Sequence, residues 1–255
     1  MSKRRYFIEL AYDGTAYNGW QVQPNGITVQ QKLNEALGTI LRQPVETLGC
    51  GRTDTGVHAR QFFAHFEVEG ISHQPSAISD ARLVRSVNGL LPYDIGVKRI
   101  FAVHDDAHAR FDATQRSYAY HVHFEKDPFL RKYSWQLSHK PDLLLMNEAA
   151  AVLKTYTDFS CFSKSNTQTF TNNCRIDHAE WTEESGGLVF RISADRFLRN
   201  MVRAIVGTLV DIGTGKIPVK TVHEIIASKN RSEAGASVPA CGLFLTEVKY
   251  PYITG

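Results

Sequence analysis

Polar and hydrophobic residues follow two different periods along the chain, and each period predicts a different kind of element. Residues 6–12 are aromatic and aliphatic in a way typical of a strand, and Asp13-Gly14 follows them as a turn. Thr28 and Gln31 have the spacing of a helix capping box, and apolar residues recur at helical intervals over 29–41. We therefore expect a strand and then an amphipathic helix at the start of the chain.

The rest of the chain continues this succession. Strands are predicted over residues 45–50, 61–68, 95–103, 117–124, 174–181, 188–192 and 243–248, and helices over residues 78–88, 142–153 and 195–210. Each half of the chain thus has approximately the order β-α-β-β-α-β. This order predicts the α+β class, with a largely antiparallel sheet and helices on one side of it. We place the N-terminal and C-terminal domains at 1–107 and 108–255.

The composition is that of a protein able to bury a full core. Of the 255 residues, 43% are hydrophobic and 22% are charged, as in ordinary globular domains. No apolar run approaches the roughly 20 residues of a membrane-spanning helix, and the chain begins as a charged strand instead of a signal peptide. We expect a cytoplasmic protein. The net charge of +3 does not by itself indicate nucleic acid, so the distribution of the charges matters more than their sum.

Neither a metal centre nor a disulfide framework is expected. The four cysteines include no C-x-x-C pair, which favours reduced and mostly buried thiols. His121 and His123 alternate on a predicted strand, but no third ligand accompanies them at a recognised interval. No phosphate-binding loop or dinucleotide fingerprint is present either. The sequence therefore predicts no cofactor and no metal.

The densest concentration of reactive residues is the segment 51–59, with the sequence GRTDTGVHA. It places Arg52 and Asp54 between two predicted strands, where glycines allow the backbone to turn and to approach a ligand. A carboxylate must be ionised to act as a nucleophile, and a nearby guanidinium favours that form. His58 is expected to hydrogen-bond this loop. The residues alone leave a plain hairpin turn with a surface aspartate equally open.

Three arginines recur in the predicted helix 195–210. Arg196, Arg199 and Arg203 are spaced at i, i+3 and i+7, which places them on one face of that helix. The guanidinium fork binds phosphate or carboxylate oxygens in pairs, so this face is a candidate for contacts of either kind. A solvated helix face is the alternative.

Two tyrosines recur on the predicted strand 117–124. Alternation places Tyr118 and Tyr120 on the same side of it, and Arg116 precedes them. An aromatic ring beside basic residues can stack on a base that has left its helix. Packing in the core is the alternative, and it fits at least one of the two.

Together these motifs closely resemble the bacterial tRNA pseudouridine synthase A family. The resemblance covers nearly the whole chain in the order of the family, and the G-R-T-D-x-G-V-H and M-V-R-x-I-V-G segments are its most specific parts. It runs through Tyr12-Asp13-Gly14-Thr15, Gly19-Trp20-Gln21, Gly51 to Ala59, Asn88 to Pro92, Asp94-Ile95, His108 to Phe111, Arg116 to Tyr118, Asp158-Phe159, Phe197 to Gly207 and Gly242 to Leu245.

The resemblance implies an enzyme that isomerises uridine to pseudouridine at positions 38, 39 and 40 of the tRNA anticodon arm. It also implies a homodimer, two similar α+β halves that meet in a basic cleft, and no cofactor. Asp54 matches the nucleophile of the family, and Tyr118 matches the tyrosine that stacks on the target uracil. Arg203 matches the arginine paired with the aspartate, and Arg52 matches an arginine associated with displacing the target base.

Several points stay open on the sequence. The carboxylate can trap the sugar at C1′, act at C1′ and C2′ to release a glycal, or attack uracil C6. A catalytically silent RNA-binding protein and a nucleoside hydrolase are the rival functions. The hydrolase lacks a second carboxylate in the matched motifs near Asp54. The segments 69–81 and 164–171 match no motif, and the choice among tRNAs is not encoded in any pattern.

Overall fold

The computed structural model describes residues 3–69, 81–164 and 170–253. The chain divides into two compact units. Unit 1 comprises Met1–Thr114 and Leu245–Gly255, and unit 2 comprises Gln115–Phe244. The division into domains at 1–107 and 108–255 stays a prediction about the organisation of the chain.

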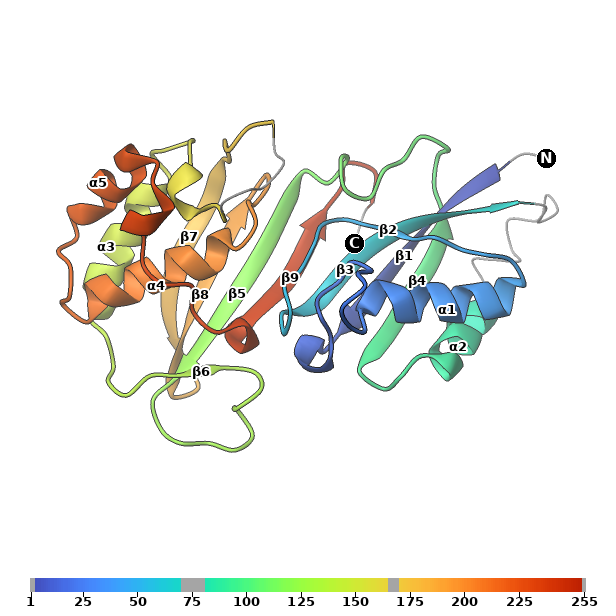
Figure 1. Ribbon diagram of the computed structural model, residues 1–255, viewed down its shortest axis with the longest axis horizontal. Coiled ribbons are helices and arrows are strands. Elements are labelled where there is room, and N and C mark those ends of the chain that lie inside the picture. Colours follow the sequence, from blue (N-terminus) through green and yellow to red (C-terminus); the bar gives the residue numbers. More distant parts are fainter. Residues whose placement is uncertain (1–2, 70–80, 165–169, 254–255) are drawn as a thin grey trace. The chain divides into compact units, whose positions relative to one another are not determined.

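Unit 1 is built from a strand-rich layer and two helices, coloured blue to green in Figure 1 except for the red strand β9. The order of its strands is β4-β1-β3-β9, with β2 paired to β3, and β1 is antiparallel to both of its neighbours. Helices α1 and α2 pack against each other. Its elements are β1 (Lys3–Tyr12), α1 (Val29–Leu41), β2 (Leu48–Gly49), β3 (His58–Glu69), α2 (Ala81–Leu90), β4 (Ile95–Ala102) and, from Leu245 on, β9 (Leu243–Lys249).

Unit 2 has strands in the order β5-β8-β7, antiparallel to one another, and the short β6 runs parallel to β5. Helix α3 packs on β7 and on α4, and Figure 1 shows α3, α4 and α5 grouped together beside these strands. The elements are β5 (Gln115–His123), β6 (Trp135–Gln136), α3 (Leu143–Leu153), β7 (Ile176–Glu184), β8 (Gly187–Ala194), α4 (Met201–Gly213) and α5 (Thr221–Ser228).

The predicted α+β class is confirmed. From β1 to β4 the chain has the expected order β-α-β-β-α-β. From β5 to β9 it has the same order with β6 and α5 added, and the last strand, β9, belongs to unit 1 from Leu245 on. Helix α1 has the predicted bounds, because Thr28 Oγ1 accepts the backbone N–H of Gln31 at 3.3 Å. The capping box is only half formed, since the Gln31 side chain bonds Glu35 instead. The predicted strand 45–50 shrinks to β2, and the start of the predicted helix 78–88 lies outside the described residues.

The predicted helix 195–210 is wrong over its first six residues, because α4 begins at Met201. The Asp195 side chain accepts the backbone N–H of Arg196 at 2.7 Å and that of Arg175 at 2.8 Å, bonds that compete with a helical start at this position. Asn200 then has a φ of 67°, a left-handed conformation that interrupts any helix. Arg196 and Arg199 therefore precede the helix, and the three arginines do not share one helix face.

Each unit has its own hydrophobic core. In unit 1, Trp20 stacks on Phe62 with ring centroids 4.2 Å apart, and in unit 2 Trp181 packs against Phe190 at 5.1 Å. The four cysteines, all of them within the described residues, form no disulfide, and three of them are buried as expected. None of the helices in the described part of the chain is long and apolar enough to span a membrane.

Candidate active site

The loop that carries Arg52 and Asp54 connects β2 to β3 in unit 1. Thr53 fixes it from inside, because its buried Oγ1 lies 2.9 Å from the hydroxyl of Tyr12, at the end of β1. The Thr53 carbonyl accepts a hydrogen bond of 3.3 Å from the backbone N–H of Trp20. These bonds tie the residue before Asp54 to β1 and to the segment that follows β1.

Two glycines let that segment lie directly against the loop. A Cβ atom on Gly14 would stand 2.0 Å from the carbonyl oxygen of Val57, and one on Gly19 would stand 2.2 Å from that of Thr53. Gly19 also has a φ of 81°, in the left-handed region. Backbones this close leave no room for a side chain, which explains why glycine stands at both positions.

The Asp54 side chain is half-buried, whereas Arg52 is exposed. The carbonyl of Asp54 accepts the N–H of Val57 at 3.1 Å, and Gly56 donates its N–H to the carbonyl of Tyr17 at 3.3 Å. The backbone is thus held on both sides of Asp54. Such a support suits a nucleophile, because little conformational freedom remains to be lost when a substrate binds.

His58 takes part in hydrogen bonding, as predicted, but its partner is the turn after β1. The backbone N–H of Gly14 donates to Nδ1 of the buried His58 at 3.1 Å, and an Asp13 carboxylate oxygen lies 3.1 Å from the same nitrogen. His58 therefore joins the end of the loop to the segment packed against it.

Tyr17 and Asp94 form a contact that the sequence did not predict. The Tyr17 hydroxyl donates to the Asp94 carboxylate, just before β4, while the Tyr17 carbonyl accepts from Gly56. Burial, and then the Asp94 carboxylate, raise the pKa of Tyr17 above its usual range, so the hydroxyl stays protonated and able to donate. The two residues are 77 positions apart, and no local pattern signals such a pairing.

In unit 2, Tyr118 and Tyr120 have different surroundings. Tyr120 is fully buried and donates its hydroxyl to the carbonyl of Pro239 at 2.8 Å, so it is a core residue. Tyr118 is half-buried, and its ring meets the ring of Phe197 edge-on at 5.1 Å. The sequence left open which tyrosine belongs to the core, and the structure assigns that place to Tyr120.

Phe197 brings Tyr118 next to the predicted arginines of unit 2, because it lies between Arg196 and Arg199. Arg199 is exposed and Arg196 is half-buried. Arg203 lies in the first turn of α4, half-buried, and its Nε donates to the carbonyl of Val238 at 2.7 Å. Arg52 and Asp54 share the loop of unit 1, whereas Tyr118, Phe197 and the three arginines belong to unit 2.

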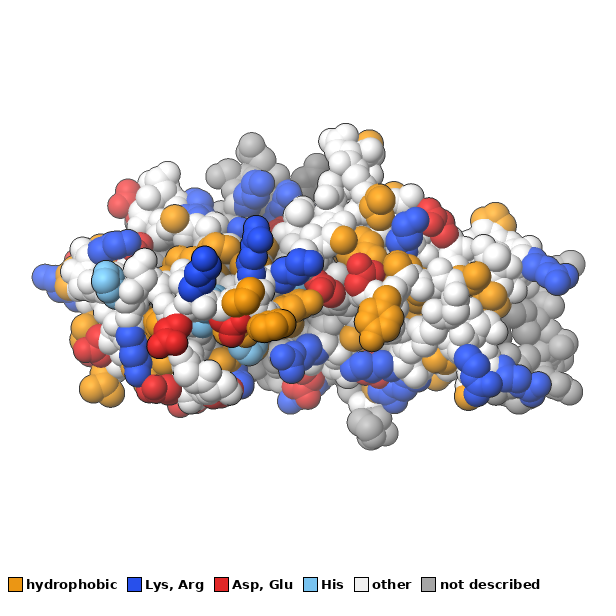
Figure 2. Space-filling view, turned by 90° about the horizontal axis from the view of Figure 1, so that it is seen from below, with side chains coloured by type: hydrophobic (Ala, Val, Ile, Leu, Met, Phe, Trp, Pro, Cys, Tyr) orange, Lys and Arg blue, Asp and Glu red, His pale blue; other side chains and the backbone are white. Residues whose placement is uncertain are grey.

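Cationic side chains are not confined to one place. In the face that Figure 2 shows, Lys and Arg side chains occur on both units, with acidic and hydrophobic side chains among them. Within the described residues, no three His, Cys, Asp or Glu side chains gather as a metal site. The buried His123, one of the two histidines considered as ligands, has Nδ1 2.9 Å from Ser134 Oγ.

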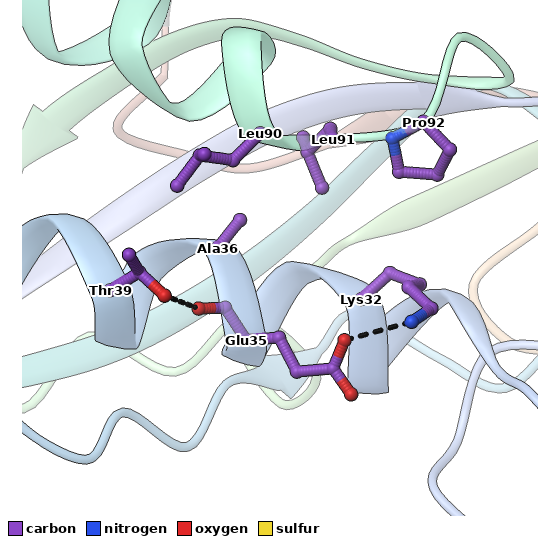
Figure 3. Close-up of a pocket in the computed structure, with 7 residues that line it drawn as sticks. All are labelled: Lys32, Glu35, Ala36, Thr39, Leu90, Leu91 and Pro92. Atoms are coloured by element: carbon purple, nitrogen blue, oxygen red, sulfur yellow. Dashed lines mark hydrogen bonds and ion pairs between the residues drawn. The ribbon is translucent and has the colours of Figure 1, made fainter.

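A surface hollow of about 440 Å³ lies between α1 and the end of α2 (Figure 3). Its polar side chains already have partners, since Lys32 pairs with the Glu35 carboxylate and the Thr39 hydroxyl donates to the backbone carbonyl of Glu35. None of its lining residues comes from the Asp54 loop, so it adds nothing to the candidate site. The lining consists of Lys32, Glu35, Ala36, Thr39, Leu90, Leu91 and Pro92.

Comparison with known proteins shows the family to which the chain belongs. A family model described as tRNA pseudouridine synthase matches residues 149–251. The chain is 52% identical over 252 residues to tRNA pseudouridine synthase A of Bacteroides fragilis, covering 98% of each chain. It is 39% identical over 245 residues to that of Bacillus subtilis, covering 94% of this chain and 97% of the relative. The chain belongs to the tRNA pseudouridine synthase A family.

The two kinds of match cover different parts of the candidate site. The family model reaches Arg196, Arg199 and Arg203 but neither Tyr118 nor the Asp54 loop. The full-length relatives span both units and therefore include the loop as well. Membership of this family makes the chain a tRNA-modifying isomerase.

Proposed function

We propose that this chain converts uridines 38, 39 and 40 of the tRNA anticodon arm to pseudouridine, with Asp54 as the nucleophile. The observation that carries the proposal is the support of Asp54: a half-buried carboxylate on backbone held from both sides by Tyr17, Trp20 and Val57. The bonds from Tyr17 and Trp20 join the loop to a distant segment, which a plain surface turn does not require.

The reaction fits a carboxylate working without a cofactor. The glycosidic bond from C1′ to uracil N1 breaks, the uracil turns, and C5 of the same base bonds to C1′ while its proton is lost and N1 gains one. Atoms balance and no net oxidation occurs. Asp54 can trap C1′ as an ester, promote a glycal, or add to uracil C6, and all three routes require an ionised carboxylate at this position.

The target base must leave its stem-loop before Asp54 can reach it, which costs a few kcal/mol. We assign Tyr118 to stacking on the extruded uracil, a contact worth about 1–3 kcal/mol. The edge-on contact with Phe197 supports this role, since it fixes the plane of the Tyr118 ring. Arg52, which is exposed on the same loop as Asp54, is assigned to displacing the target base.

The remaining arginines divide into two roles. Arg203 is proposed to pair with Asp54 and to favour its ionised form. Arg196 and Arg199 are proposed to contact RNA phosphates. Both lie just before α4, Arg199 is exposed and Arg196 is only half-buried, and this accessibility supports the role. Arg196 and Arg199 do not share a helix face with Arg203, but their guanidinium groups can bind phosphate oxygens in either arrangement.

Two further properties belong to the proposal. We expect the enzyme to act as a homodimer in the cytoplasm, where its substrate is. Light scattering on the purified protein tests the first point: a mass of about one chain at working concentration contradicts a dimer.

Mapping of pseudouridine in tRNA tests the function itself. tRNA from cells that lack the gene should have uridine at 38, 39 and 40, and supply of the wild-type gene should restore pseudouridine there. Unchanged modification at these positions would contradict the proposal. Purified enzyme acting on transcribed tRNA separates the rivals, because release of free uracil indicates a hydrolase and binding without turnover indicates a silent RNA-binding protein.

A further inference from the structure

A clamped segment lies over the start of α4 in unit 2. We call residues 231–239 the strap. Arg231, at its beginning, donates to the carbonyls of Ala234 and Gly235 at 3.3 Å and 3.1 Å and to Ser237 Oγ at 2.9 Å. One guanidinium therefore bonds three residues of the strap. It holds in place a segment whose small and polar residues predict only a loop.

The strap is also bound to α4 and to the residue before it. Asn200 Nδ2 donates to Ser237 Oγ at 2.5 Å, and the Gly235 N–H donates to Thr208 Oγ1 at 2.9 Å. A Cβ atom on Gly207 would stand 2.0 Å from the Ala236 carbonyl oxygen, so strap and helix backbones are in direct contact. These contacts hold the strap in place against the helix.

Arg203 is the residue that this arrangement holds. Its Nε donates to the Val238 carbonyl at 2.7 Å, and its own carbonyl accepts the Val238 N–H at 3.3 Å. Val238 is only 4% exposed. A guanidinium is planar, so a hydrogen bond at Nε restricts the orientation of the whole group, and Val238 thereby helps to determine where the guanidinium of Arg203 lies.

We propose that the strap is the device that orients Arg203 and that Arg231 is a positioning residue acting through Val238. The inference rests on the proposed function, since it assumes that Arg203 serves the reaction. Arg231 touches no reacting atom. Its loss removes the bonds to the carbonyls of Ala234 and Gly235 and one of the two bonds to the Ser237 hydroxyl, so the Val238 carbonyl is held less firmly.

A double-mutant cycle on the full-length enzyme tests this dependence. Arg231→Ala should slow the single-turnover rate on transcribed tRNA by about tenfold, equivalent to about 1.4 kcal/mol, with nearly unchanged tRNA affinity. In an Arg203→Ala background the same substitution should have no further effect on the rate. The matched control is Arg191→Ala, which also removes three side-chain hydrogen bonds in unit 2, to Thr182 and Glu184, and should keep the wild-type rate.

Arg231→Lys keeps the charge but cannot span three acceptors, so it should share the defect while keeping the fold. NMR gives a direct readout: the Arg203 Nε–H signal, assigned by its loss in Arg203→Ala, should exchange faster with solvent in Arg231→Lys. A wild-type rate in folded Arg231→Lys, or a full additional loss in the Arg203→Ala background, overturns the inference. A wild-type rate in Arg203→Ala overturns the assigned role of Arg203, and the inference with it.

Discussion

Gly19 lies against the carbonyl of Thr53 so closely that a Cβ atom there would stand 2.2 Å from the oxygen. The contact joins the segment after β1 to the residue before Asp54, and the adjacent Trp20 N–H bonds the same carbonyl. A glycine with no reactive group thus determines the position of the proposed nucleophile.

Gly19→Ala should therefore displace the loop. The added methyl group forces Thr53 to move, and a displacement of about 1 Å at a reacting group can cost about 100-fold in rate. We expect the single-turnover rate to fall by about 10-fold to about 100-fold, with much smaller change in tRNA affinity. Quenched single-turnover assays on transcribed tRNA measure the rate, and filter binding measures the affinity.

Gly186→Ala is the matched control for Gly19→Ala. Gly186 has a φ of 77°, close to the 81° of Gly19, but a Cβ atom there would meet nothing within 4 Å. It should lose about 1–2 kcal/mol of stability through backbone strain and keep the wild-type rate. Equal rate defects in the two variants would show that strain, and not the contact with Thr53, is responsible.

His65 makes the stability of unit 1 depend on pH. Its imidazole is 3% exposed, and Nδ1 accepts the N–H of Ala109 at 3.1 Å. Burial, and next His108 and Arg5, lower the pKa of His65 to about 4, whereas Glu67 and Asp112 act in the opposite direction. In the unfolded chain His65 binds a proton near its ordinary pKa of about 6.5, whereas in the folded chain it binds one only near pH 4. The free energy of unfolding therefore decreases as the pH falls from about 6.5 to about 4.

The free energy of unfolding should therefore decrease by roughly 2 kcal/mol between about pH 7.5 and about pH 5 through His65 alone. Urea titrations of wild type and His65→Asn at both pH values isolate this contribution, because the asparagine oxygen can still accept from Ala109 but cannot titrate. The exposed His139, replaced by asparagine, should keep the wild-type dependence. If His65→Asn shows the full wild-type decrease, His65 is not the cause.

Arg199 and Arg203 should respond differently to removal, because one is exposed before α4 and the other is held by Val238. Arg199→Ala should weaken tRNA binding and reduce the slope of log K against log salt by roughly one. Arg203→Ala should lower the single-turnover rate far more than the affinity. Binding-only defects of equal size in both variants would make Arg203 another phosphate contact.

The sequence predicted α1 to the residue, since both its apolar period and its Thr28 cap are local. It failed at 195–200 because the entry to α4 depends on Asp195 bonding Arg175, a residue on another segment, and on a left-handed Asn200. Likewise the Asp54 loop was found from its residues, but its support by Tyr17 and Asp94 was not, because hydrogen bonds between distant segments leave no period in the sequence. The role of Asp54 came from family resemblance, and residue pattern alone left it undecided.

The most direct test of the account is the single-turnover rate of Asp54→Asn, measured with its tRNA affinity. The amide keeps the shape of the carboxylate but cannot act as a nucleophile. We predict no detectable pseudouridine, with the dissociation constant for tRNA within about tenfold of wild type. Asp105→Asn, which neutralises an exposed aspartate of the same unit, should leave the rate unchanged. Substantial pseudouridine formation by Asp54→Asn would contradict the central claim.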